Sequence, residues 1–341
     1  MNAHNWGIPA ISISGSYSEP SAFTAKWWEG VRALPTLPSV LFRFLGLVGD
    51  SQNTVEEIAE FVCQDPALLA RVLPVLPEGF SGVNDMALRQ AITSLGRDRL
   101  RALAHTTPLI RSLDTASSGS YATTLWERSL LCASVSQAAA SFLGLTRPER
   151  YYVGGLLHDI GYLVVLQKRS DLFTSALKRW TRRPAGLLEM EAETFGANHC
   201  EIGISVARQL QIHPWFYPAI ASHHTPALDG DQVSRITALA SAFCSWQGLD
   251  LFPKQLFSTH SFTAGFRERE ARTREMHEIL RGLVPQLLEI DRHHLLACML
   301  STVRPIRAAF RETFMDRFVA GESWTQTYRY AQAAETIAAV A

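Results

Sequence analysis

Helix-start signals recur along this chain at short intervals, and they are the feature that most constrains its fold. Thr54 is followed three residues later by Glu57, which is the spacing of a capping box. Asp65-Pro66 is a second start signal, an N-cap residue followed by proline at the first helical position. Apolar residues recur at helical spacing after these signals, whereas strand-like alternation is almost absent. The sequence therefore predicts an all-α fold.

The composition excludes several classes of protein. The chain has 341 residues, enough for a large core, and its 32 basic and 32 acidic residues leave no net charge. This balance argues against a nucleic-acid binder, which would need a broad basic surface. No apolar run approaches the roughly 20 residues that cross a bilayer, and the N-terminus lacks the pattern of a secretory signal. We therefore expect a cytoplasmic protein that binds neither nucleic acid nor membrane.

The cysteines indicate a reducing compartment. They are odd in number, scattered, and without the C-x-x-C spacing of a zinc ribbon or redox motif. We expect buried free thiols at Cys63, Cys132, Cys200, Cys244 and Cys298.

The pattern of helix signals and polar breaks divides the chain into three parts. Residues 1–25 are rich in Ser, Gly and Pro and show no period, so we expect a flexible lead there. Residues 26–228 form the main helical region, which a Ser-rich linker over 115–121 divides into subdomains over 26–113 and 121–228. Residues 229–341 carry further amphipathic runs and are expected to form a C-terminal helical extension.

The segment YYVGGLLHDIGY, residues 151–162, carries the strongest chemical signal. An apolar helix, for which Thr146 and Glu149 provide a capping box, delivers a histidine and an aspartate side by side. An imidazole and a carboxylate that converge on one point suit a divalent cation. Further histidines follow in FGANHCEIG and IASHHTP. The candidate metal ligands are His158, Asp159, His199, His223 and His224.

A structural role competes with this interpretation at each position. A single histidine is more often a satisfied core or surface residue than a ligand. A buried aspartate such as Asp159 needs a partner, but a cationic side chain or helix-end amides satisfy it as well as a metal does. Only the combination of the three segments predicts a shared polar cluster.

Seven segments together resemble the HDOD domain, a bacterial signalling module related to the HD phosphohydrolases and the HD-GYP phosphodiesterases. The resemblance runs from Leu34 to Pro226. It implies a helical N-terminal subdomain packed on a helical HD-like subdomain. The segments, in order, are LPTLPSV, VEEIAEFVCQDPALLARVL, ALRQAITSLGRDRLRAL, LWERSLLCA, GLLHDIGYLVVL, LLEMEAETFGANHCEIG and AIASHH.

The chain departs from the active members of that superfamily at two ligand positions. Arg128 stands where the first histidine ligand of the HD enzymes falls, and a guanidinium cannot coordinate a cation. The last aspartate ligand should fall near Ser241, where the sequence has no carboxylate. The GYP motif is also missing, with Tyr162 where the cyclic-di-GMP enzymes have lysine. What remains resembles half of a two-metal site.

Arg128 admits two interpretations. Two unit charges about 4 Å apart attract by roughly 4 kcal/mol at an effective dielectric of about 20. Arg128 could therefore pair with Asp159 and replace the charge of the first metal. Alternatively, it points to solvent from the rim of its helix.

The sequence thus favours a regulatory, signal-transducing module with a degenerate HD site and no catalytic residues. Such a module would bind a signalling protein partner or a small anionic ligand, and it would need no cofactor. The alternative is a metal-dependent phosphohydrolase acting on a nucleotide or cyclic dinucleotide. The surviving ligands could hold one divalent transition metal: iron, manganese, zinc or nickel.

Overall fold

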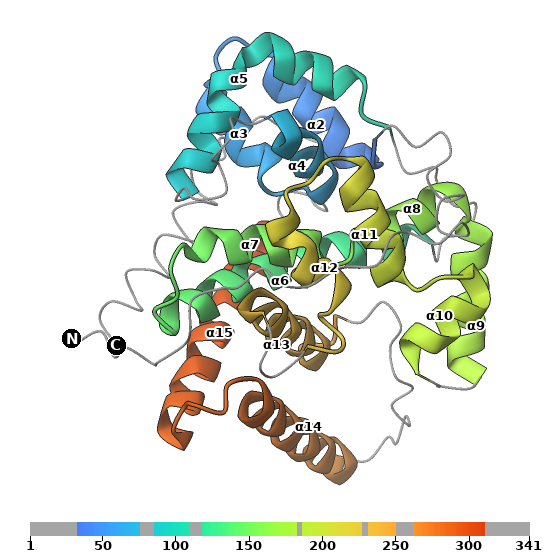
Figure 1. The fold of residues 1–341 in the computed structure, drawn as a ribbon, viewed down its shortest axis with the longest axis vertical. Coiled ribbons are helices and arrows are strands. Elements are labelled where there is room, and N and C mark those ends of the chain that lie inside the picture. Colours follow the sequence, from blue (N-terminus) through green and yellow to red (C-terminus); the bar gives the residue numbers. More distant parts are fainter. Residues whose placement is uncertain are drawn as a thin grey trace.

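The computed structural model describes residues 33–75, 85–108, 118–182, 186–226, 231–249 and 262–310. Every regular element in these ranges is a helix, so the predicted all-α fold is confirmed (Figure 1). The lead expected over residues 1–25 lies outside the described residues.

A first group of helices occupies one end of the molecule (top of Figure 1). Helix α5 packs against both α2 and α3, and the apolar faces of the group are buried. Gly96 takes a left-handed φ of 75° and kinks α5, because glycine adopts that conformation without strain. The group consists of α2 (Pro38–Gly49), α3 (Val55–Val62), α4 (Pro66–Val72), the 3₁₀ turn η1 (Leu73–Val75) and α5 (Asp85–His105).

A second, larger group forms the middle of the molecule around α6, which packs against α7, α13 and α15. Gly155 allows α7 to pack closely on α6, because a Cβ there would lie only 2.7 Å from the Cys132 carbonyl oxygen of α6. The group consists of α6 (Ser118–Phe142), α7 (Pro148–Leu157), α8 (Ile160–Lys168), α9 (Ser170–Arg182), α10 (Leu187–Phe195), α11 (His199–Gln209), η3 (Pro214–Phe216), α12 (Tyr217–Ala221) and α13 (Gln232–Trp246).

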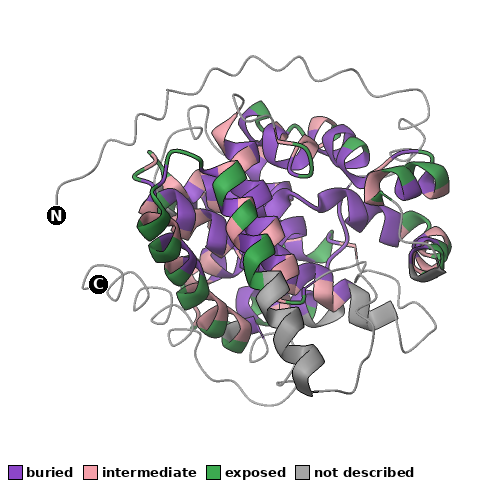
Figure 2. Ribbon diagram, turned by 90° about the horizontal axis from the view of Figure 1, so that it is seen from below, coloured by how far each residue is buried: buried purple, intermediate pink, exposed green. Residues whose placement is uncertain are grey.

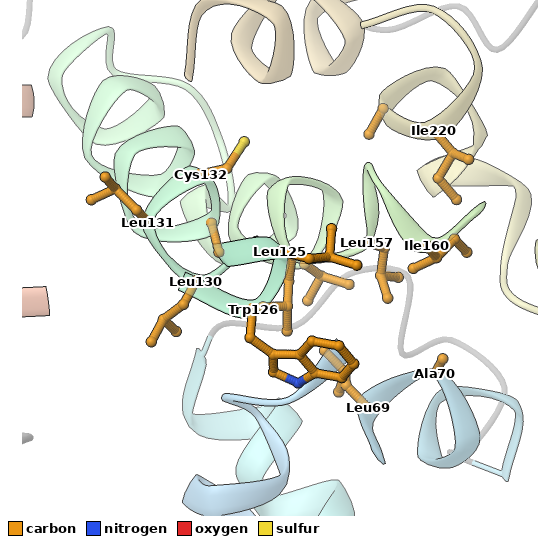
Figure 3. Close-up of a cluster of buried hydrophobic side chains, with 14 of the residues drawn as sticks. Leu69, Ala70, Leu125, Trp126, Leu130, Leu131, Cys132, Leu157, Ile160 and Ile220 are labelled. Atoms are coloured by element: carbon orange, nitrogen blue, oxygen red, sulfur yellow. The ribbon is translucent and has the colours of Figure 1, made fainter. Parts of the chain in front are cut away.

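The two groups meet at Trp126, whose ring projects from α6 toward α4 and lies near Leu69 (Figure 3). Its indole nitrogen donates to Asp65 Oδ2 at 2.6 Å, and the Thr36 hydroxyl donates to the same oxygen, also at 2.6 Å. Asp65 Oδ1 accepts from the backbone of Leu68 and caps α4. A fully buried carboxylate thus joins the first group of helices to the second.

Two long C-terminal helices complete the described part of the chain. Helix α14 (Phe262–Leu283) packs on α13, and α15 (Glu289–Phe310) returns to α6. Arg307 of α15 donates to Glu127 of α6 at 2.8 Å. Figure 2 shows that the outer helices turn their buried residues toward the middle of the molecule and their exposed residues outward.

The local start signals are only partly right. Thr54 and Glu57 form the expected capping box, and Asp65 caps α4 with Pro66 at its first position. The box expected at Thr146 and Glu149 is wrong, because Arg147 is the N-cap residue of α7 and makes no side-chain cap. The linker expected over 115–121 is wrong for residues 118–121, since α6 is already helical at Ser118, and residues 115–117 lie outside the described residues.

All five cysteines are free, and four of them are buried. None of the helices in the described ranges combines the length and the apolar character that crossing a membrane requires.

Candidate functional site

His158 and Asp159 lie at a break between two helices and not inside one helix as the sequence suggested. His158 follows the last residue of α7, and Asp159 precedes the first residue of α8. The break aims both side chains at the same interior point, with His158 Nε2 2.9 Å from Asp159 Oδ2. Both residues are buried.

Gly161 allows this break to lie against α11. A Cβ on Gly161 would fall 2.0 Å from the carbonyl oxygen of His199, so any larger residue would push the two helices apart. The glycine therefore sets the approach of His199 to Asp159, and the distance between His199 Nε2 and Asp159 Oδ1 is 3.5 Å.

The other histidines come from the ends of two helices. His199 is the first residue of α11, which Asn198 and Glu201 open with a capping box. His223 and His224 follow α12, and His223 Nε2 lies 3.3 Å from His199 Nε2 and 3.5 Å from Asp159 Oδ1. His199 and His223 are buried, whereas His224 is exposed. The structure thus brings the five predicted ligands into one cluster.

Arg128 of α6 lies inside this cluster and not at the solvent rim. Its Nε donates to Asp159 Oδ2 at 3.1 Å, and the two side chains are only 7% and 2% exposed. The rest of the guanidinium is held by α13 and the turn after it. Nη2 donates to Ser241 Oγ at 2.6 Å, and Nη1 donates to the Leu249 carbonyl at 2.8 Å and to Ser245 Oγ at 3.3 Å.

Backbone carbonyls and a carboxylate fix which imidazole nitrogen carries a proton. The Nδ1 atoms of His158 and His223 lie 2.7 and 2.9 Å from the carbonyls of Gly155 and Ala219. A carbonyl only accepts, so each Nδ1 is the donor and each ring directs its Nε2 into the cluster. The buried Nε2 of His158 lies against Asp159 Oδ2 at 2.9 Å.

The electrostatics favour an ionised aspartate. Burial opposes ionisation, but His158, His223 and Arg128 hold the pKa of Asp159 well below its ordinary value. Burial lowers the pKa of His223 to about 4, so this ring is neutral at pH 7. Burial also acts to lower the pKa of His199, but Cys200 and Glu191 raise it well above its ordinary value.

Three neighbours of the cluster were not predicted as site residues, and the first two are Glu191 and Tyr162. Glu191 of α10 is buried and accepts from the ring Nδ1 of His199 at 2.6 Å and from its backbone N–H at 3.0 Å. The Tyr162 hydroxyl donates to the other oxygen of Glu191, and its ring stacks on that of His199 at 4.3 Å between centroids. The segment LLEMEAETFG offered only an amphipathic pattern, so no sequence signal singled out Glu191.

Cys200 is the third such neighbour. Its Sγ lies 3.4 Å from His199 Nε2, and burial raises the pKa of its thiol. Its place next to His199 in the sequence was the only available signal, and adjacency alone does not indicate a shared site.

The ligand atoms fit a cation on one side of Asp159 better than on the other. His199 Nε2, His223 Nε2 and Asp159 Oδ1 form a triangle with sides of 3.3, 3.5 and 3.5 Å. Ligands about 2.0–2.2 Å from one ion have separations of this size. On the Oδ2 side, the guanidinium of Arg128 lies where a cation bound by Asp159 Oδ2 and His158 would otherwise lie.

The chain is similar to several solved structures. The MmoQ response regulator of Methylococcus capsulatus str. Bath is 21% identical with a TM-score of 0.50, and the match covers 78% of this chain and 98% of that one. This match shows likeness of fold alone. An HDOD domain protein from Geobacter sulfurreducens is 23% identical with a TM-score of 0.48, over 86% and 98% of the two chains. No curated protein matches the chain significantly.

The model of one protein family matches the sequence. The match is to the HDOD domain, over residues 34–226. These residues include the helix break at Asp159, both histidine segments and Arg128, and they make up more than half of the chain. The chain therefore belongs to the HDOD domain family.

Proposed function

We propose that this protein is a regulatory module of bacterial signal transduction whose HD-type site is a non-catalytic scaffold. The observation that carries the proposal is the buried pair of Arg128 and Asp159. A hydrolytic two-metal centre needs its aspartate between two ions. Here one oxygen of that aspartate is bonded to a permanently charged guanidinium.

The surroundings of Arg128 support the same conclusion. Ser241 stands where an active enzyme would carry its last carboxylate ligand, and its hydroxyl accepts from the guanidinium instead. Ser245 and the Leu249 carbonyl accept further N–H groups. The arginine that takes the place of a metal thus finds hydrogen-bond acceptors on the facing helix and the turn after it. This agreement between several residues argues for a specific buried arrangement and not for the loss of a single ligand.

The module would act by binding a signalling protein partner or a small anionic ligand in the cytoplasm, with no role for nucleic acid or membrane. The junction at Trp126 is the place where binding could be transmitted. The polar contacts that cross it include the bond from Trp126 to Asp65 and one from the Tyr152 hydroxyl to the Cys63 carbonyl at 3.3 Å. A partner that favours one packing of the two helix groups would shift the population between packings.

A second candidate function rests on a separate observation. The triangle of His199, His223 and Asp159 could hold one transition metal, which would activate a water for attack on a phosphodiester. Under this alternative the protein would be a one-metal phosphohydrolase acting on a nucleotide or cyclic dinucleotide.

Activity measurements on the full chain decide between the two. Nucleotides and cyclic dinucleotides are incubated with the protein and added iron, manganese, zinc or nickel, with His199→Ala as the baseline. We expect no hydrolysis above that baseline. Turnover that the wild type supports and His199→Ala abolishes would refute the module and favour the phosphohydrolase.

Arg128→His tests the idea of charge replacement. If the guanidinium stands in for an ion, the variant should bind more metal per chain than the wild type. An unchanged metal content would count against the idea. A pull-down from the native cell, repeated with Trp126→Phe, tests whether the junction contributes to partner binding.

A further inference from the structure

Cys200 adds a sulfur ligand to the three histidines at the side of the site away from Arg128. The ligand atoms of His199, Cys200, His223 and His224, here called the cysteine-histidine set, all lie within 4.8 Å of one another. We propose that this set is a zinc site closed by four protein ligands, with Cys200 as its thiolate.

Hydrogen bonds turn the Nε2 atoms of two rings of the set toward each other. Nδ1 of His199 donates to Glu191 Oε2, and Nδ1 of His223 donates to the Ala219 carbonyl. The two Nε2 atoms then point into the set and are 3.3 Å apart. A metal ion bound by both rings would take the place of a proton that these two atoms otherwise share.

Two separations within the set match tetrahedral coordination. Zinc bonds of about 2.05 Å to nitrogen and about 2.3 Å to sulfur place two nitrogens about 3.3 Å apart and a nitrogen and a sulfur about 3.6 Å apart. The observed values are 3.3 Å between the two Nε2 atoms and 3.4 Å between His199 Nε2 and Cys200 Sγ. All separations in the set are within 4.8 Å, so binding one ion would draw its ligand atoms together by at most about 1 Å.

Charge favours the thiolate over Asp159 as the anionic ligand. The guanidinium of Arg128 bonds to Asp159 and partly neutralises it, and it would repel a divalent ion held closely by that carboxylate. Cys200 supplies a separate negative charge, because zinc binding releases the thiol proton to solvent and leaves a sulfur–zinc bond. Mixed nitrogen and sulfur ligands suit zinc.

The surroundings have the features of a metal site. Glu191 bonded to Nδ1 of His199 is the carboxylate–histidine arrangement that orients ligating imidazoles, and the Tyr162 hydroxyl steadies the carboxylate in turn. His199, Cys200 and His223 are buried, so the exposed His224 marks the entry path.

The role of the zinc ion rests on the proposed function, in which the site does not catalyse hydrolysis. Four protein ligands leave no position for a water or a substrate, as in structural zinc sites. Zinc would therefore join α11 to the segment after α12 and stabilise one arrangement of the module without adding hydrolysis.

Cobalt substitution tests the site on the full chain. The protein is stripped with chelator, loaded with Co²⁺, and examined by metal analysis and absorption spectroscopy. We expect one cobalt per chain and an intense near-ultraviolet thiolate-to-cobalt band. Cys200→Ser should lose the band, whereas Cys63→Ser, a buried cysteine outside the set, should keep it. Glu191→Gln should weaken zinc binding by about 10- to 100-fold.

His224→Gln changes an exposed side chain, so this variant should fold as the wild type does. It should weaken cobalt binding by at least about tenfold, since it removes one of four ligands. Absence of bound cobalt in the wild type would overturn the inference and indicate a proton between the two Nε2 atoms. Bound cobalt without the thiolate band would also overturn it and assign the ion to nitrogen and oxygen ligands. The proposed function fails separately, through phosphodiester turnover by the wild type.

Discussion

Nε of Arg128 bonds to Oδ2 of Asp159 at 3.1 Å, and this ion pair is almost entirely shielded from water. A buried ion pair contributes little net stability over an apolar replacement, but breaking it leaves an uncompensated charge inside the protein. The pair is therefore the place where a single substitution should have the largest electrostatic effect.

Arg128→Met should lower the free energy of unfolding by about 3–5 kcal/mol, because Asp159 loses its permanent counter-charge. Urea denaturation followed by circular dichroism measures the loss. The double variant Arg128→Met/Asp159→Asn removes both charges and should lose less than the sum of the two single variants, by about 0.5–3 kcal/mol. Additive losses would mean that the two side chains are not energetically coupled.

Asp65 should make stability depend on pH in a defined direction. Burial raises the pKa of Asp65 above its ordinary value of 3.8, although hydrogen bonds from Thr36, Trp126 and the backbone oppose the rise. The folded state therefore binds the proton more tightly than the unfolded chain does. The free energy of unfolding falls as pH rises from 3.8 through the folded pKa.

Asp65→Asn removes this titration and tests its sign. The stability advantage of the wild type over the variant should be larger near pH 4.5 than near pH 7. Asn offers one acceptor where Asp65 accepts from both Trp126 and Leu68, so the variant should also lose about 1–3 kcal/mol near pH 7. Asp98→Asn, which changes an exposed aspartate of α5, is the control.

Two glycine-to-alanine substitutions should have opposite effects. Gly161→Ala should destabilise the protein by more than about 3 kcal/mol, because the new Cβ would collide with the backbone of His199 and α11 cannot yield locally. Gly46→Ala, inside α2 and with open space around the new methyl group, should stabilise it by about 1 kcal/mol. Thermal unfolding of both variants checks the pair. Equal effects would show that helix propensity alone decides.

Glu191→Gln should cost about 1–3 kcal/mol, because one acceptor of a buried carboxylate that receives three N–H or O–H groups becomes a donor. Glu201→Gln is the control at the start of α11, the helix whose first residue bonds to Glu191. Glutamine also completes a capping box there, so this variant should be nearly neutral. Urea denaturation of the two variants compares them. A large loss for Glu201→Gln would point to a general sensitivity of the start of α11.

Local chemistry explains which parts of the structure could be predicted from the sequence. The helix caps at Thr54 and Asp65 involve side chains and backbone within three residues, so the pattern alone determines them. Thr146 failed because Arg147 adopts a left-handed conformation and Pro148 begins α7, which displaces the cap. The break between α7 and α8 was missed because an apolar run gives no sign of a single non-helical residue such as Asp159.

The site shows the same division. The five candidate ligands could be listed from the sequence, since they lie in recognisable segments. The position of Arg128 could not be decided, because its partners Ser241 and Ser245 come from a helix more than a hundred residues away. Glu191 and Cys200 escaped notice for a similar reason, since their contacts depend on how α10 and α11 pack.

The hydrogen-bond acceptors of Arg128 also determine how short a fragment of this protein can be while keeping the native site. Three of its acceptors belong to Ser241, Ser245 and Leu249, all of which lie after residue 226, where the family match ends. A fragment cut at that boundary would leave a guanidinium facing the interior with Asp159 but without those acceptors. Recombinant pieces should therefore extend at least through Leu249 if they are to keep the arrangement found in the whole chain.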